Sequence, residues 1–140
     1  MTDIERAVKN LDGHTISLCK GRMVLTCDKR GIAPMMDFIA DGVDLAGYSV
    51  ADLVVGKAAA MLFVKTGIRE VYAKTMSVGA RTVLDKFGLG YQYDKLADNI
   101  INRDGTDICP MEKAVANVSD PNEAYVCIKK QLALLRAQQK

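Results

Sequence analysis

The chain has 140 residues, 49% of them hydrophobic and 26% charged, with a formal net charge of +2 at pH 7. This length fits one domain over residues 1–140, and the hydrophobic content excludes a disordered chain. The 19 basic and 17 acidic residues nearly balance, and no basic run is longer than two, so there is no electrostatic footprint for binding nucleic acid.

The compartment is predicted from the N-terminus, the apolar runs and the cysteines. The N-terminal segment is charged and is not typical of a signal peptide. The most apolar run, residues 53–64, is interrupted by Lys57 and is too short to span a bilayer. The four cysteines contain no Cys-x-x-Cys pair, so we interpret them as reduced thiols of a cytoplasmic protein with no membrane contact: Cys19, Cys27, Cys109 and Cys127.

The first half of the chain is predicted to contain a helix, a hairpin and two more helices. "TDIERAVKNLDG" begins with Thr2 as N-cap and Glu5 three residues later, which indicates a short helix. "HTISLCKGRMVLTC" alternates apolar and polar residues around Lys20-Gly21, which is typical of a β-hairpin. "RGIAPMMDFIADG" has proline in its first turn and glycine past its end, as a helix does. The run from Ser49 to Thr66 is apolar on nearly every face and predicts one long buried helix.

The second half is predicted to alternate strands and helices. "IREVYAKTM" and "LGYQYDKLA" are the strands, and "SVGARTVLDKFG", capped by Ser77, is the helix between them. A polar loop, "DNIINRDGTDI", leads to a short helix after Cys109, and a last helix starts at Asp120-Pro121. Together these elements predict an α/β domain, a three-layer α-β-α fold with a mixed sheet.

Cys109 is the first candidate catalytic residue. In "TDICPMEKA" the proline suits the first helical position, which makes Cys109 the N-cap and Glu112 the third helical residue. Unpaired N–H groups and the helix dipole lower the pKa of the Cys109 thiol and favour a thiolate. The negative charges of Asp107 and Glu112 raise that pKa, although either carboxylate could instead act as a proton carrier. The alternative is an inert capping thiol, with Glu112 bonded back to the N-cap N–H.

Lys57, Ser77 and Arg103 are candidate anion-binding residues. Lys57 lies in "VVGKAAAM" with little polar surface around it, so its amine either extends to water or holds an anion or acts as a base. Gly56 beside it permits close approach of a ligand or of another part of the chain. Ser77 starts a helix whose N–H groups can bind an anion, or it is an ordinary cap. Arg103, in the loop "NRDGTD", can clamp a carboxylate or phosphate, or it belongs to a plain polar turn.

No metal or cofactor is predicted. A zinc site needs three or four converging ligands. The sequence offers one histidine, His14, in an apolar strand, together with scattered cysteines and carboxylates.

Two segments carry a resemblance to a known family. "DLVVGKAAAMLFV" and "IINRDGTDICPMEKAV" resemble a family of small uncharacterised bacterial proteins placed within the cytidine-deaminase-like fold. The resemblance covers nearly the whole chain and implies a cleft where two helix starts meet the strand ends. Zinc deaminases carry a His or Cys ligand with a catalytic Glu at the first helix start, and Pro-Cys-x-x-Cys at the second. Here those places read Gly56, Lys57, Ala58 and Met76 to Gly79, so deamination through zinc hydroxide is rejected.

Two functions are left open. In the first, the cleft near Lys57 and Cys109 binds a small anionic molecule, nucleotide-like by analogy of fold, with thiol-based catalysis as an option. In the second, the domain is a non-catalytic regulatory or protein-interaction module in which Cys109 is a redox-sensitive or merely capping thiol. Assembly into a homo-oligomer also stays open.

Overall fold

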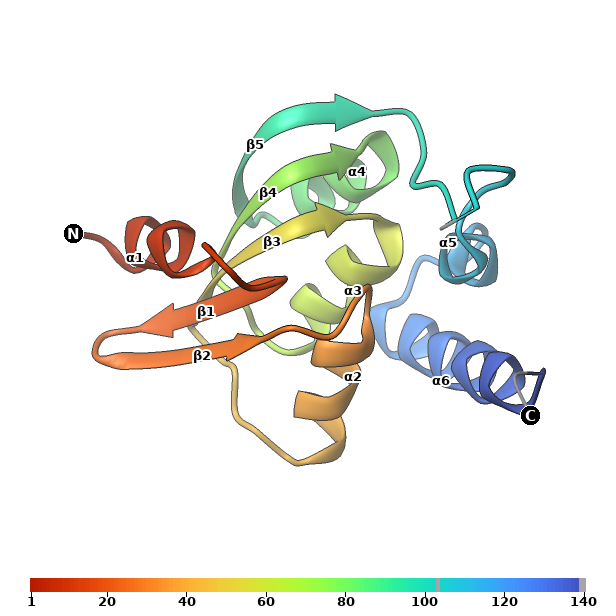
Figure 1. The fold of residues 1–140 in the computed structure, drawn as a ribbon, viewed down its shortest axis with the longest axis horizontal. Coiled ribbons are helices and arrows are strands. Elements are labelled where there is room, and N and C mark those ends of the chain that lie inside the picture. Colours follow the sequence, from red (N-terminus) through yellow and green to blue (C-terminus); the bar gives the residue numbers. More distant parts are fainter. Residues whose placement is uncertain (103, 139–140) are drawn as a thin grey trace.

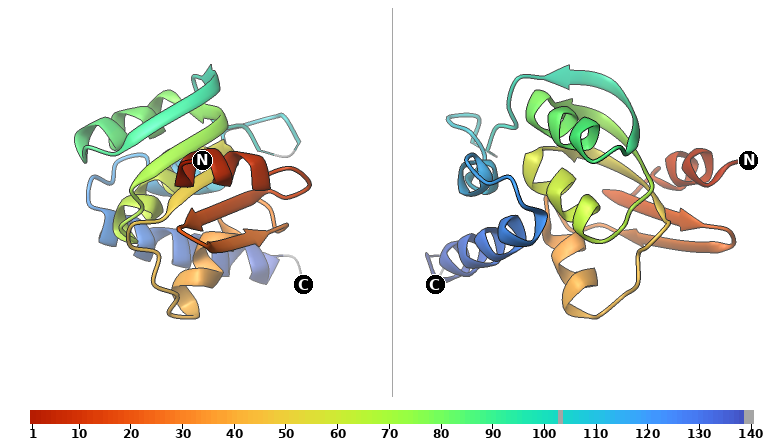
Figure 2. Two further views of the ribbon diagram at one scale, coloured as in Figure 1. Left: turned by 90° about the vertical axis from the view of Figure 1, so that its left-hand side faces the viewer. Right: turned by 180° about the vertical axis from the view of Figure 1, so that it is seen from behind.

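The protein folds around one five-stranded sheet with helices on both faces, as the computed structural model of residues 1–102 and 104–138 describes it (Figures 1 and 2). The strands are β1 (Ile16–Lys20), β2 (Met23–Cys27), β3 (Ser49–Val55), β4 (Glu70–Ser77) and β5 (Gly90–Ala97). The helices are α1 (Asp3–Asn10), α2 (Ala33–Ala40), α3 (Lys57–Lys65), α4 (Val78–Lys86), α5 (Pro110–Val115) and α6 (Pro121–Gln138).

The sheet is mixed, as predicted, with strand order β2-β1-β3-β4-β5. β1 and β2 form the predicted antiparallel hairpin, and β1 also pairs antiparallel with β3. β3, β4 and β5 are parallel, with α3 and α4 as the connections between them. Because both helices follow parallel strands, they begin at the same edge of the sheet, beyond the carboxyl ends of β3 and β4 (Figure 1).

The prediction of one helix from Ser49 to Thr66 is wrong. Residues Ser49–Val55 form β3 in the middle of the sheet, and α3 begins only at Lys57, after Gly56 as N-cap. A central strand is buried on both faces and therefore has the same continuous apolar run as a buried helix. Consequently Lys57 lies in the first turn of α3 rather than in mid-helix.

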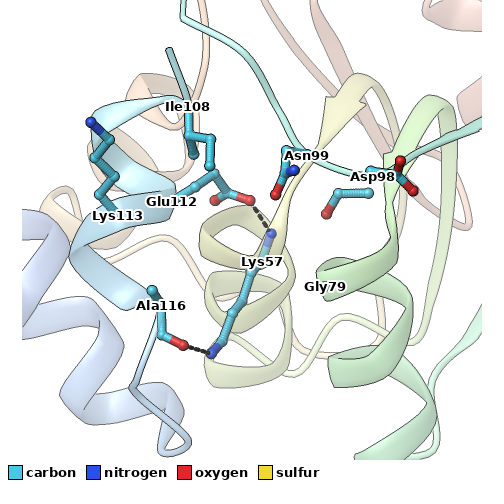
Figure 3. Close-up of a pocket in the computed structure, with 9 residues that line it drawn as sticks. Lys57, Gly79, Asp98, Asn99, Ile108, Glu112, Lys113 and Ala116 are labelled. Carbon is cyan, nitrogen blue, oxygen red and sulfur yellow. Dashed lines mark hydrogen bonds between the residues drawn. The ribbon is translucent and has the colours of Figure 1, made fainter.

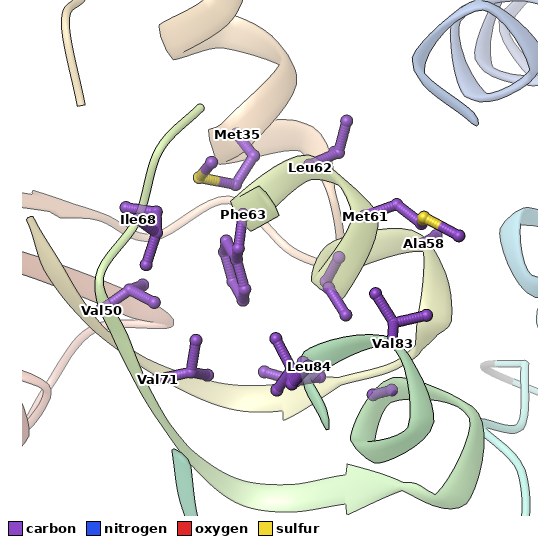
Figure 4. Packing of buried hydrophobic residues seen from close by; sticks show 14 of the residues in the cluster. Met35, Val50, Ala58, Met61, Leu62, Phe63, Ile68, Val71, Val83 and Leu84 are labelled. Carbon is purple, nitrogen blue, oxygen red and sulfur yellow. The ribbon is translucent and has the colours of Figure 1, made fainter. Parts of the chain in front are cut away.

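The larger hydrophobic core lies between the sheet and helices α2, α3, α4 and α6. Phe63 of α3 is fully buried and lies among residues of the sheet and of α4, including Val50, Val71 and Leu84 (Figure 4). Helix α6 packs on the outside of α3 and α5.

A smaller core lies under α1 on the other face of the sheet, and Figure 2 shows α1 on the side away from α4. Its members are Ile4, Ala7, Leu11, Cys19, Ala51 and Tyr72. The predicted caps of α1 and α4 are confirmed, since Thr2 and Ser77 accept hydrogen bonds from the N–H groups of Glu5 and Ala80. None of the helices in the described part of the chain is both long and apolar enough to cross a membrane.

Candidate functional site

A cavity of about 190 Å³ lies where α3 and α4 begin, and we call it the Lys57 pocket. Helix α5 and the segment after β5 complete it (Figure 3). Its lining residues are Lys57, Ser77, Gly79, Asp98, Asn99, Ile108, Glu112, Lys113 and Ala116. Ligands of open α/β sheets bind beyond the carboxyl ends of the strands, which is the position of this cavity.

Glu112 reaches from α5 to the start of α3. Its Oε1 accepts a hydrogen bond from the Lys57 N–H at 2.7 Å, and its Oε2 accepts one from the Ala58 N–H at 2.9 Å. The first N–H groups of a helix lack partners within the helix and carry the positive end of its dipole, so a carboxylate is a favourable cap there. The sequence predicted that Glu112 caps its own helix. In the structure it caps α3 instead, through Lys57 and Ala58, which are 55 and 54 residues away in sequence.

Gly56 makes this approach sterically feasible. A Cβ atom at position 56 would lie 2.2 Å from Glu112 Oε1 and 2.8 Å from Ile100 Cγ1. Real Cβ atoms do not come so close to other heavy atoms. The close approach expected at Gly56 is thus made by a side chain of the protein itself.

Lys57 completes a reciprocal contact between α3 and α5. Its Nζ donates a hydrogen bond to the Ala116 carbonyl at 3.0 Å, and Ala116 is the C-cap of α5 (Figure 3). A cation at the C-terminus of a helix is favourable because the last carbonyls lack partners there. Glu112 therefore caps the start of α3 while Lys57 caps the end of α5.

Helix α4 starts on the same pocket but lacks a comparable carboxylate. Its N-cap Ser77 is buried and accepts from the Ala80 N–H at 3.0 Å. Among the side-chain hydrogen bonds of residues 1–102 and 104–138, none involves the N–H of Val78 or Gly79. Gly79 lines the pocket, and a Cβ atom there would lie 3.6 Å from Lys57 Cβ, an ordinary contact.

Cys109 lies outside this set of lining residues. It is the N-cap of α5, as predicted, but its side chain makes no capping hydrogen bond. The thiol is half-buried and packs against the larger core. The structure therefore brings Lys57, Ser77 and Glu112 to one cavity and leaves Cys109 outside its lining, packed against the larger core.

Asp107 belongs to the loop that precedes α5. Its carboxylate is paired with the Lys113 ammonium and accepts a hydrogen bond from the Ile108 N–H, and both hold its pKa below the usual 3.8. Arg103, the other predicted loop residue, lies outside the described residues. Within the described chain, no three His, Cys, Asp or Glu side chains gather closely enough to hold a metal ion.

Three lining residues were not predicted from the sequence. Asp98, Asn99 and Lys113 are exposed and form the rim of the pocket. Asp98 and Asn99 directly follow β5, so a parallel arrangement of three strand ends would have indicated them. Lys113 gives no comparable signal, because its position depends on how α5 packs against α3.

Comparison with known proteins places the chain in a family. The family model TM1506, a domain of unknown function (DUF1893), matches residues 6–132. The chain belongs to this family. The crystal structure of a DUF1893 family protein, TM1506 from Thermotoga maritima, is similar to it with a TM-score of 0.85 and 26% sequence identity. The match covers 94% of this chain and 91% of that chain. Comparison with curated proteins gives no match.

Proposed function

We propose that this DUF1893 protein binds a small molecule through a carboxylate or phosphate group in the Lys57 pocket. The observation that carries the proposal is the difference between the two helix starts. The N–H groups of α3 hold the Glu112 carboxylate, while Gly79 at the start of α4 lines the same cavity and donates its N–H to no side chain of the described residues. An anion at α4 would repeat the contact that Glu112 makes at α3.

The charges around the pocket favour an anion. The Lys57 ammonium bonds a neutral carbonyl, and no carboxylate of the described chain lies within 4.0 Å of it. The Glu112 charge is offset by two N–H groups and the α3 dipole. Asp98 is exposed at the rim, where water screens it. The Lys57 ammonium and the N-terminal end of α4 are therefore the charges at the cavity that favour an anion.

The size of the pocket limits the ligand. Its volume of about 190 Å³ is below the ~300 Å³ at which pockets for drug-sized molecules begin. Only a small acid, or the phosphate end of a larger molecule, fits inside. The nucleotide-like ligand suggested by a cytidine-deaminase-like fold would therefore bind with its base outside the cavity.

Binding is proposed ahead of thiol-based catalysis because Cys109 does not line the pocket. A zinc-dependent deamination is not proposed, since the two helix starts offer no histidine or cysteine as ligand. The alternative function is a non-catalytic regulatory or protein-interaction module, and such a module would use the same pocket.

The test is a titration of the ¹⁵N-labelled protein with inorganic phosphate and, separately, acetate, followed by amide chemical shifts. We expect saturable shifts at Val78 and Gly79 in the millimolar range. Lys57→Gln should weaken phosphate binding about 5-fold, as expected for loss of one charged contact. The matched control is Lys65→Gln on the same helix, whose ammonium bonds Asn122 outside the pocket.

Two results would reject the proposal. One is the absence of saturable shifts at α4 with either anion. The other is an equal loss of affinity in Lys57→Gln and Lys65→Gln, which would indicate general charge attraction rather than a site.

A further inference from the structure

Strand β2 is an open edge of the sheet that lacks the usual protection against pairing. It is the outermost strand beside β1 (Figure 1), and its sequence, MVLTC, has no charged residue and no proline. Met23 and Val24 are 57% and 41% exposed. Edge strands normally carry charges, prolines or bulges that block association. The other edge strand, β5, carries Asp94 and Lys95.

The hairpin register determines which backbone groups of β2 are free. The turn at Gly21-Arg22 has two residues, with Gly21 at a φ of 58°, and closes on the pair Lys20 and Met23. Pairing alternates along an antiparallel ladder, so Met23, Leu25 and Cys27 bond to β1. Val24 and Thr26 then direct their N–H and C=O groups outward, where the described residues provide no partner.

We propose that β2 pairs antiparallel with β2 of a second copy of this chain, across a two-fold axis at Leu25. This register pairs all five residues of the strand and places the outward groups of Val24 opposite those of the partner's Thr26. Other registers that join outward-facing residues pair fewer of them. The contact is isologous, as the interfaces of two-fold dimers are, and joins two five-stranded sheets into one.

Charge complementarity supports a second copy as the occupant. In this register Arg22 of one chain lies opposite Asp28 of the other, each directly beyond one end of β2. The two-fold axis repeats the pair, so two opposite-charge pairs flank the apolar strands. The exposed Met23 lies beside the partner's Cys27. A five-residue strand buries less area than a standard interface, so we expect a dimer only at about 100 µM and above.

The test is analytical ultracentrifugation over a range of concentrations, with charge reversals at both ends of the strand. The wild type should approach twice the mass of the 140-residue chain. Arg22→Asp alone and Asp28→Arg alone should stay monomeric, because each sets like charges opposite each other. A mixture of the two variants should dimerise, and so should the double variant, since both restore opposite charges.

Two controls separate pairing from a disturbed fold. Lys95→Asp reverses a charge on the other edge strand and should leave the dimer intact. Circular dichroism and thermal unfolding should show that Asp28→Arg is folded, although Asp28 loses its contact with His14 Nδ1, which is 2.6 Å long. A wild type that stays monomeric at millimolar concentration would overturn the proposal. A dimer unaffected by the single reversals would overturn it as well.

Discussion

Replacing Asp52 with asparagine is expected to stabilise the folded protein increasingly as the pH rises from about 4 to 8. Asp52 lies in β3, between Ile16 of β1 and Ala73 of β4, and is only 7% exposed. Within the described residues it has no basic partner. Burial raises the pKa of its carboxyl group from the usual 3.8 to about 8, and the N–H groups of Val54 and Leu53 offset part of that rise.

The sign follows from proton binding. Between these two pKa values the folded protein keeps the Asp52 proton and the unfolded chain releases it, so raising the pH favours unfolding. The stability that proton binding by Asp52 adds to the folded protein is fully present below pH 3.8 and is lost above about pH 8. It falls by about 1.4 kcal/mol for each pH unit between them, or about 4 kcal/mol by pH 7. Asparagine keeps the shape and has no charge to lose, so it avoids this cost.

The assay is urea unfolding of wild type and Asp52→Asn at several pH values. The variant should match the wild type to within about 1 kcal/mol at pH 4 and exceed it by about 4 kcal/mol at pH 7. The control is Asp44→Asn, an exposed aspartate that accepts from the Ala46 N–H. Its effect should stay within about 0.5 kcal/mol at every pH. A constant difference between wild type and Asp52→Asn from pH 5 to 8 would refute the reasoning.

Three other predictions concern the contact between α3 and α5 and the cysteines. Gly56→Ala should destabilise the fold by about 1–3 kcal/mol in urea unfolding because its Cβ displaces Glu112, whereas Gly90→Ala, whose nearest contact would be 3.6 Å, should cost less than about 1 kcal/mol. Glu112→Gln should cost about 1–2 kcal/mol in the same assay, since one of its two acceptor oxygens becomes a donor facing an N–H group; an unchanged midpoint would contradict the cap. In alkylation followed by mass spectrometry, Cys19 should react most slowly, because it is fully buried and burial raises the pKa of its thiol. Labelling of Cys109 ahead of the other half-buried cysteines would favour thiol chemistry, and labelling at their rate would favour an unreactive thiol.

Much of the fold follows from local signals in the sequence. The hairpin, the caps at Thr2 and Ser77, and the α4–β5 unit are specified by residues a few positions apart. The β3–α3 segment is not. Most of its apolar residues are buried, both in the strand and in the helix, so periodicity cannot separate strand from helix. Gly56 marks the boundary between β3 and α3. The need for glycine there is explained only by the position of Glu112, which would clash with a Cβ atom at position 56.

The candidate site was predictable in part. Lys57, Ser77 and Glu112 were indicated by their local positions, and the structure brings all three to one cavity. What joins them is the packing of α5 against α3, a contact between segments about 55 residues apart. The same packing turns Cys109 toward the core. No spacing rule within "TDICPMEKA" distinguishes a thiol that faces the core from one that faces a pocket.

The measurement that tests anion binding most directly is the phosphate titration of Gly79→Asp, with Gly79→Ala as the neutral control. A side chain at this position starts 3.6 Å from Lys57 Cβ and has room to extend. A carboxylate in the first turn of α4 should stabilise the helix by about 0.3–1 kcal/mol. It should also repel phosphate, so we predict a raised melting temperature together with at least a 10-fold loss of affinity, while Gly79→Ala keeps its affinity to within about 3-fold. Wild-type phosphate affinity in Gly79→Asp would contradict the account.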